Sequence, residues 1–343
     1  MGLSIVIYLF LGGTGAGACL VAACLGISAL RLAFRGSFAN LNESAISHPA
    51  AERARRNGRR LLAESLYAAR KTLTASFMAA AFCLAAGACF LLVDLGRPDR
   101  ALSLLTRPAP SYVAMGAWTL GICLCLALLL AFAWKRHATL PPALGFALHG
   151  ITAVVSAVVM TYTGLLLASI MATPLWNSPW LAPLFFLSAT SCGCAVVLLC
   201  ARGLRLYRTH PHVMRALLLA DGVIIVLEAA ATAAFVVCAT CSAGPAALAT
   251  QTAAALPLAS LSPYEQAQLA GAFTLVRGLQ APWFWGGYVL CGLIAPLTLE
   301  FAARRSPRLE PALAPMCAIG VLIGGVALRY CIVLAGTQAT SLL

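Results

Sequence analysis

Charged residues are scarce in this sequence. Asp, Glu, Lys and Arg make up only 10% of the 343 residues, whereas 62% are hydrophobic, and the mean hydropathy is +0.92. A soluble domain carries about 25% charged residues, so this chain cannot cover itself with a solvated surface. Its solvent is therefore expected to be lipid, in which only helices and closed barrels satisfy every backbone polar group. The apolar runs are long and continuous, which favours helices.

Histidine is also scarce, and only His149 of the five histidines lies within an apolar run. A haem held between two facing histidines is therefore not expected. The sequence lacks a Cys-x-x-Cys-His motif, a phosphate-binding glycine loop and a serine-nucleophile elbow. Its fourteen cysteines are scattered, and the close pairs Cys192/Cys194 and Cys238/Cys241 have no further pair to complete a four-ligand site. We expect no metal, haem or iron–sulfur cluster here, although a Cys238–Cys241 disulfide stays open.

Eight segments are long and apolar enough to span a membrane, which takes about 20 residues. The sequence thus predicts an all-α integral membrane protein with a single polytopic domain. No basic stretch precedes the first apolar segment, so no cleavable signal peptide is expected. The predicted spans are about 4–30, 72–93, 112–134, 143–172, 179–201, 214–240, 283–301 and 312–336.

The basic residues are distributed unevenly between the connecting loops. The net charge is +13, and the loops after the odd-numbered spans hold 18 of the 23 Lys and Arg residues, whereas the loops after the even-numbered spans hold four. This asymmetry predicts cytoplasmic odd loops and both termini outside, rather than a nucleic-acid partner. The basic loop 31–71 is either a docking surface for anionic lipid or a partner, or a solvated topology anchor. We expect residues 241–282 to form a long external loop with some helix.

Ionisable residues inside the predicted spans are costly and are usually functional. Asp221 and Glu228 are seven residues apart in one span, and therefore share a face about 10 Å apart along the axis. Arg329 lies in the outer half of the last span, and Tyr162 lies near mid-membrane. These groups are either proton acceptors and donors, or structural pairs such as Glu228–Arg329. Glu64 and Glu300, near the cytoplasmic ends of their spans, either extend a proton path inward or are solvated helix ends.

The outer ends of the spans carry motifs that resemble those of a known family. They are the glycine run in 8–18, Leu-Val-Asp-Leu-Gly-Arg-Pro at 92–98, the segment 162–179 with its Pro-Leu-Trp-Asn-Ser-Pro, and the segment 324–336. In this order they resemble the NrfD/PsrC family, the membrane anchor subunits of polysulfide reductase-like molybdopterin oxidoreductases. The resemblance covers nearly the whole chain.

The resemblance implies eight helices in two four-helix bundles, in a bacterial inner membrane. It implies an anchor that binds menaquinone or another quinone and carries no redox cofactor of its own. Electrons would pass between the quinone and a ferredoxin-like partner with four [4Fe–4S] clusters, which in turn serves a molybdopterin catalytic subunit. The quinone site would lie near the face where the iron–sulfur partner docks.

The resemblance also suggests roles for particular residues. In related proteins an aspartate and a tyrosine contact the quinone, and Asp221 and Tyr162 are the candidates in this sequence. Glu228 and Arg329 would take part in quinone binding or proton transfer. The glycine run would shape one wall of the pocket, or it would serve helix packing alone.

Two groups at the outer helix ends complete the candidate site. Asp94 and Arg97 form either a charged lip over the quinone or an ion pair that fixes the end of a helix. Trp176, Asn177 and Pro179 form either a partner-docking corner or an interfacial anchor. A secondary transporter that uses the same carboxylates is the alternative function, and it would require paired unwound helices and an inverted repeat.

Overall fold

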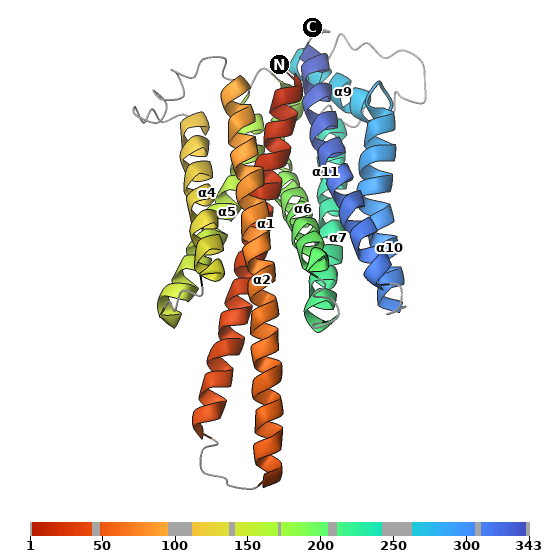
Figure 1. The fold of residues 1–343 in the computed structure, drawn as a ribbon. Helices are drawn as coiled ribbons and strands as arrows, with labels where there is room; N and C mark the ends of the chain where they lie inside the picture. Colours follow the sequence, from red (N-terminus) through yellow and green to blue (C-terminus); the bar gives the residue numbers. More distant parts are fainter. Residues whose placement is uncertain are drawn as a thin grey trace.

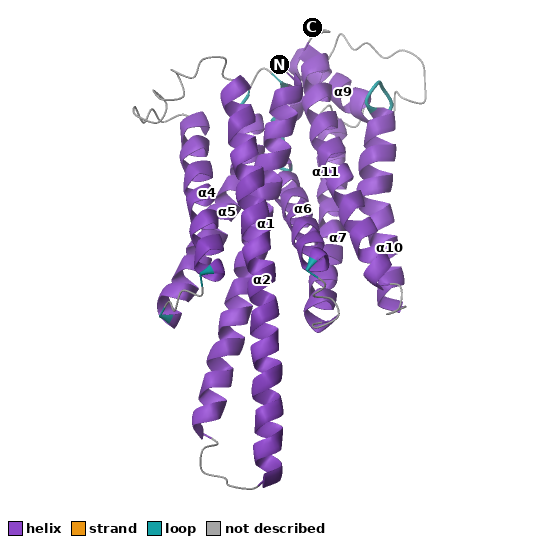
Figure 2. Cartoon of the chain, in the orientation of Figure 1, coloured by secondary structure: helices purple, strands orange, loops and turns teal. Residues whose placement is uncertain are grey.

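The computed structural model describes residues 2–42, 49–94, 112–136, 141–170, 173–204, 211–241, 263–305 and 310–340. Every regular element within these ranges is helical (Figure 2). Eight of the helices are long and apolar enough to cross a membrane, which confirms the predicted fold class. The spans run over Leu3–Phe34, Ala63–Val93, Ala114–Lys135, Pro142–Ala168, Leu181–Gly203, Val213–Thr240, Trp283–Arg305 and Ala312–Thr337.

The helices run alternately between two ends of the molecule (Figure 1). The start of α1 and the end of α11 lie at one end, here called the termini face. The opposite end is called the hairpin face, because α1 and α2 project there beyond the other helices. Which face is cytoplasmic stays a prediction. The elements are α1 (Gly2–Asn42), α2 (Pro49–Asp94), α4 (Tyr112–Lys135), α5 (Pro142–Ala168), η1 (Pro174–Trp176), α6 (Leu181–Gly203), α7 (Pro211–Cys241), α9 (Pro263–Val276), η4 (Trp283–Ile294), α10 (Ala295–Arg305) and α11 (Glu310–Thr340).

Three helices form the centre of the molecule. The spans in α1, α6 and α11 are buried over most of their length, whereas those in α2, α4, α7 and the continuous η4–α10 helix keep a wide face toward the surroundings. One buried cluster joins α2, α4 and α5 to α1, and another joins α7, η4 and α11 to α6. This division suits the two bundles that the family resemblance implies, with α1 and α6 in contact between them.

Glycines allow the central helices to touch through their backbones. A Cβ atom at Gly17 of α1 would overlap the carbonyl group of Ala189, and a Cβ at Gly193 of α6 would overlap the backbone of Gly17. Gly292 and Gly324 make a similar contact between η4 and α11. Small residues allow this kind of close approach between membrane helices, so the packing role expected for the glycine run is confirmed.

The segment 31–71, expected to be a loop, is helical over most of its length. α1 continues to Asn42, and α2 begins at Pro49. At 1.5 Å per residue these helices are about 60 and 70 Å long, whereas a bilayer core is about 30 Å thick. The basic segment is therefore a projecting helical hairpin. The region 241–282 contains α9, as expected, and its Ala272 and Leu275 are buried.

Candidate functional site

A buried group of polar side chains lies in the half of the molecule next to the termini face. The Tyr288 hydroxyl group donates to Glu228 Oε1 at 3.2 Å and lies 2.6 Å from the Thr232 hydroxyl oxygen. Thr232 also donates to the carbonyl oxygen of Glu228 at 2.8 Å. The three side chains are buried and join α7 to η4. We call this group the Glu228–Tyr288 cluster.

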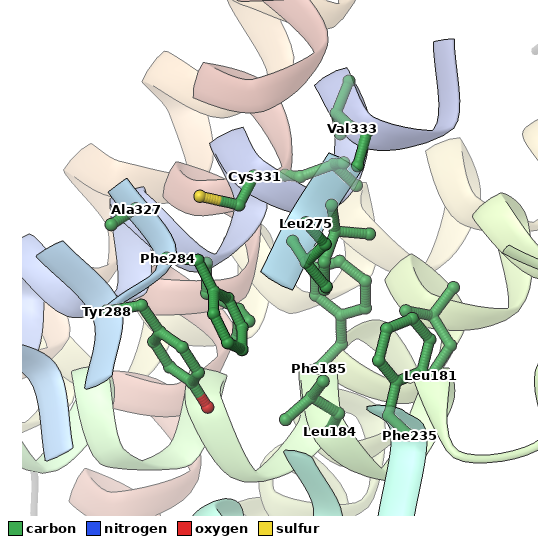
Figure 3. Packing of buried hydrophobic residues seen from close by; sticks show 14 of the residues in the cluster. Leu181, Leu184, Phe185, Phe235, Leu275, Phe284, Tyr288, Ala327, Cys331 and Val333 are labelled. Carbon is green, nitrogen blue, oxygen red and sulfur yellow. The ribbon is translucent and has the colours of Figure 1, made fainter. Parts of the chain in front are cut away.

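Tyr288 reaches this position from an unusual stretch of backbone. η4 is a π-helix over Trp283–Ile294, and π-helical turns are rare and often occur at functional sites. Its wider turn changes which side chains face the interior. The ring of Phe284 packs 5.8 Å from that of Tyr288, and Figure 3 shows the two rings side by side, facing Leu184 and Phe185 of α6.

Arg329 of α11 is fully buried next to this cluster, with 0% of its surface exposed. Its Nη1 donates to the Gly325 carbonyl oxygen at 2.8 Å and to the Ser188 hydroxyl oxygen at 3.2 Å, and its Nε donates to the Leu9 carbonyl oxygen at 3.3 Å. Two aromatic rings flank the guanidinium group, Phe185 at 5.4 Å and Phe10 at 5.8 Å.

One nitrogen of the Arg329 guanidinium group remains available as a hydrogen-bond donor. Within the described part of the chain, Nη2 has no hydrogen-bond partner. It points toward α1, where a Cβ atom at Gly13 would lie 3.0 Å away. A buried guanidinium group with an unused donor is costly, so this nitrogen marks a place where an acceptor would be favourable.

Glu228 and Arg329 do not form the direct ion pair that the sequence left open. Ser188 of α6 lies between them, because its hydroxyl accepts from Arg329 and also faces the Glu228 carboxyl group. The carboxyl and guanidinium groups therefore interact electrostatically, while Arg329 Nη2 stays available to another acceptor.

Tyr162 of α5 lies elsewhere. Its ring fits against α4 at Gly116, where a Cβ atom would overlap the phenol, and it neighbours the buried Tyr8 of α1. Its hydroxyl group faces that of Tyr8 but has no hydrogen bond of good geometry to any described residue. Because Arg329 contacts Leu9 and Gly13 of the same turns of α1, the structure places α1 between Tyr162 and the Glu228–Tyr288 cluster.

A second polar group lies nearer to the hairpin face. Asp221 of α7 accepts a 2.8 Å hydrogen bond from Ser191 of α6. Glu300 of α10 accepts from the Cys317 thiol at 3.6 Å and lies 3.7 Å from an Arg304 nitrogen. Single ligand atoms of Asp221, Glu300 and Cys317 lie within 4.8 Å of one another. Glu300 is therefore not a solvated helix end, and we call this group the Asp221–Glu300 pair.

The other intramembrane and interfacial acids behave differently. Glu64 is exposed on the hairpin and pairs with Arg60 at 3.4 Å, which does not suit an inward proton path. The side chain of Asp94 and the whole of Arg97 lie outside the described residues. Their role as a lip over the quinone stays a prediction.

The docking corner has one inward-facing and two outward-facing residues. Trp176 is buried and donates from Nε1 to the Ile332 carbonyl oxygen at 2.9 Å, so it ties η1 to α11. Asn177 and Pro179 are exposed, and Asn177 Nδ2 donates to the Tyr264 hydroxyl at 2.9 Å. Docking stays a prediction for all three residues, and the indole of Trp176 packs inside the protein.

His149 has both ring nitrogens engaged. Trp134 Nε1 donates to Nε2 at 3.1 Å, so Nδ1 carries the proton and donates to the Gly145 carbonyl oxygen at 2.8 Å. A Cβ atom at Gly26 would overlap the ring. This histidine therefore packs α5 against α1 and α4.

Sequence reasoning missed Tyr288, Thr232, Ser188 and Ser191. The hydroxyl residues are common in membrane helices, where they also bond to their own backbone, so their presence alone carried no signal. The run Ser188–Ala–Thr–Ser191 of α6 does repeat hydroxyl groups at three-residue spacing. That spacing is the one feature that could have indicated a polar stripe.

Eight spanning helices around buried carboxyl, phenol and guanidinium groups define a polytopic membrane protein with an internal polar site. The family model described as polysulphide reductase, NrfD, matches residues 59–340. The chain therefore belongs to the NrfD family, whose members are membrane subunits of oxidoreductase complexes and generally associate with iron–sulfur and molybdopterin subunits. The match begins within α2, so α1 and the tip of the hairpin precede it. No curated protein matches the chain.

Proposed function

We propose that this subunit exchanges electrons between the quinone pool of a bacterial cell membrane and an iron–sulfur partner subunit of a molybdopterin oxidoreductase. Quinol and quinone interconvert by moving two electrons and two protons. The protein must therefore hold the quinone head group near the partner and provide groups that accept or donate protons. Menaquinone or a related lipid-soluble quinone is the expected substrate.

The observation that carries the proposal is the unused Nη2 of Arg329, next to the hydrogen-bonded Tyr288 and Glu228 side chains. A quinone oxygen is an acceptor, and it would satisfy this donor. The adjoining phenol and carboxyl groups suit proton exchange with the same oxygen. The rings of Phe10 and Phe185, which already flank the guanidinium group, suit contact with a flat head group.

Tyr162 offers a second unused hydroxyl group on the other side of α1. Because α1 separates Tyr162 from Arg329, one head group cannot contact both, so a quinone contact at Tyr162 would be a second position on the α4–α5 side. Asp221 lies about 10 Å further along α7 from Glu228, so we assign it to proton transfer rather than to quinone contact.

The termini face is where we expect the iron–sulfur partner to dock. Its exposed residues near η1 and α9 include Asn177, Pro179, Trp180 and Tyr264. Tyr264 is fixed by its hydrogen bond from Asn177. A fixed aromatic and amide surface suits a protein contact, and a partner seated there would lie on the same side as the Glu228–Tyr288 cluster.

The experiment is quinol-dependent electron transfer by the purified complex. Arg329→Ala and Glu228→Gln should lower this turnover strongly while the complex still assembles, and Glu64→Gln on the exposed hairpin should not. Co-purifying subunits with iron and molybdenum should accompany the wild-type chain. Wild-type turnover in both assembled variants would reject the site, and ion transport by the isolated chain would support the transporter alternative instead.

A further inference from the structure

The Asp221–Glu300 pair lies nearer to the hairpin face than the Glu228–Tyr288 cluster, and the hydroxyl groups of Ser191 and Ser188 on α6 lie between the two groups. We propose that this pair is a proton-transfer site that links the hairpin face to the cluster, so that protons of the quinone reaction are exchanged with the side where the hairpin projects. The inference rests on the proposed function, because it names the route for that site's protons.

The two carboxyl groups are buried without full hydrogen bonding. Asp221 is 0% exposed and Glu300 is 1% exposed. In the described part of the chain, Asp221 Oδ2 and Glu300 Oε2 have no hydrogen-bond partner. Two ionised carboxylates this close in an apolar interior would repel each other strongly, and a shared proton relieves the repulsion. The two carboxyl groups lie within hydrogen-bonding reach of each other, so one shared proton would satisfy both oxygens.

Glu300 also lines a pocket near the end of α10 at the hairpin face. A pocket of about 400 Å³ on α10 is lined by Leu297, Thr298, Glu300, Phe301 and Arg304. The Arg304 side chain is 38% exposed, and its Nη2 lies 3.7 Å from Glu300 Oε2. Glu300 thus lines a pocket together with a partly exposed cation, and we take this pocket as the proton entrance.

The pair also connects toward the termini face through α6. Ser191 donates to Asp221 at 2.8 Å, and Ser188, three residues earlier, accepts from Arg329 and faces Glu228. Side chains three residues apart on a helix have Cβ atoms about 5–6 Å apart, a distance that one water molecule can bridge. Glu300, Asp221, Ser191, Ser188 and Glu228 therefore form a series of neighbouring polar groups.

The charged and titratable groups that face the pair come from three helices. Cys194 of α6 lies next to both carboxyl groups, Cys317 of α11 donates to Glu300, and Arg304 of α10 is the nearest cation. Glu228 and Cys192 lie further toward the cluster. One positive charge thus faces two carboxyl groups, so one of these two is expected to hold a proton while the other is ionised.

Only protons move along this route. In the oxidising direction, the quinol loses two electrons to the partner's iron–sulfur clusters. Its two protons pass one at a time to the Glu228 carboxylate, directly or by relay through the Tyr288 hydroxyl, which gives up its own proton as it takes one; each proton then moves along α6 and α7 before the next is accepted. In the reducing direction, each transfer runs in reverse. Neither direction requires a further oxidant or reductant.

The test uses the whole complex in liposomes with a pH-sensitive dye on the hairpin side. Glu300→Gln and Asp221→Asn should lower quinol-dependent turnover and dye response together by about 100-fold, the scale of a lost proton-transfer group, while a quinone analogue still binds. Glu64→Gln, the same change on the exposed hairpin, should match the wild type. Unchanged turnover and an unchanged dye response in Glu300→Gln would overturn the inference and leave the quinone function standing.

A second measurement needs no turnover. Dicyclohexylcarbodiimide labels protonated carboxyl groups that are reachable from lipid, so wild-type membranes should yield a labelled peptide that contains Glu300. Infrared difference spectra of the wild type and Asp221→Asn should differ in the C=O stretch of a protonated carboxyl group. If neither signal is found, the shared proton is rejected, even in a complex that lacks quinone activity.

Discussion

Replacing Tyr288 with phenylalanine tests the Glu228–Tyr288 cluster most directly. The change removes one hydroxyl group and keeps the ring that packs on Phe284. It deletes the 3.2 Å hydrogen bond to Glu228 and the 2.6 Å contact with Thr232.

The expected loss of stability is small. Side-chain hydrogen bonds in membrane proteins contribute on average about 0.6 kcal/mol each, and a buried acceptor left without its partner costs about 1–3 kcal/mol. The assembled complex should therefore survive with a modestly lower melting temperature. If Tyr288 takes part in proton transfer, turnover should fall by about 100-fold or more, equivalent to roughly 2.7 kcal/mol in the barrier.

The matched control is Tyr330→Phe, the same chemical change one residue beyond Arg329 in α11. The Tyr330 ring packs on Trp283 at 5.8 Å. The assay is quinol-dependent turnover of the purified complex, normalised to its iron content, together with thermal melting. Equal turnover in the two variants, with both complexes assembled, would show that Tyr288 serves packing alone.

Three further predictions concern helix packing, quinone binding and partner docking. Gly193→Ala should prevent assembly, because its Cβ would overlap the backbone of Gly17. The control Gly121→Ala faces open space and should assemble normally. The yield of each variant on size-exclusion chromatography measures assembly. Arg329→Lys should assemble but bind a quinone analogue less tightly, because lysine carries its donors on a single nitrogen and cannot hold Leu9 and Ser188 while it presents a separate nitrogen to the quinone. An affinity equal to that of the wild type in a titration would count against quinone contact. Trp180→Ala should weaken co-purification of the iron–sulfur subunit without changing the melting of the isolated chain, and full recovery of the partner would place docking elsewhere.

Much of the fold could be predicted from the sequence, because lipid imposes a simple rule on helix length and polarity. The eight spans and the burial of Asp221, Glu228 and Arg329 follow from that rule. The hairpin could not be predicted as helical, because the rule says nothing about helices once they leave the bilayer.

The candidate site was harder to predict from the sequence than the fold, for two physical reasons. Tyr288 faces Glu228 from a π-helical stretch, and the 3.6-residue periodicity assumed for helices in a sequence does not describe which side chains such a stretch turns inward. Tyr162 and Glu228 both carry groups that can exchange protons with a quinone, but nothing in the sequence shows that α1 lies between them. Partner and quinone assignments depend on family membership, and the residues alone could not provide them.

The projecting hairpin can be used to determine the orientation of the protein in the membrane. Because α1 and α2 extend about 30 Å past the bilayer core, an epitope tag or protease cleavage sequence inserted between Asn42 and Pro49 would lie far from every buried polar group. Its accessibility in intact cells and in inverted vesicles would report which compartment Glu300 faces. The same insertion would provide a handle for antibody fragments in electron microscopy of a complex whose membrane part otherwise lacks landmarks.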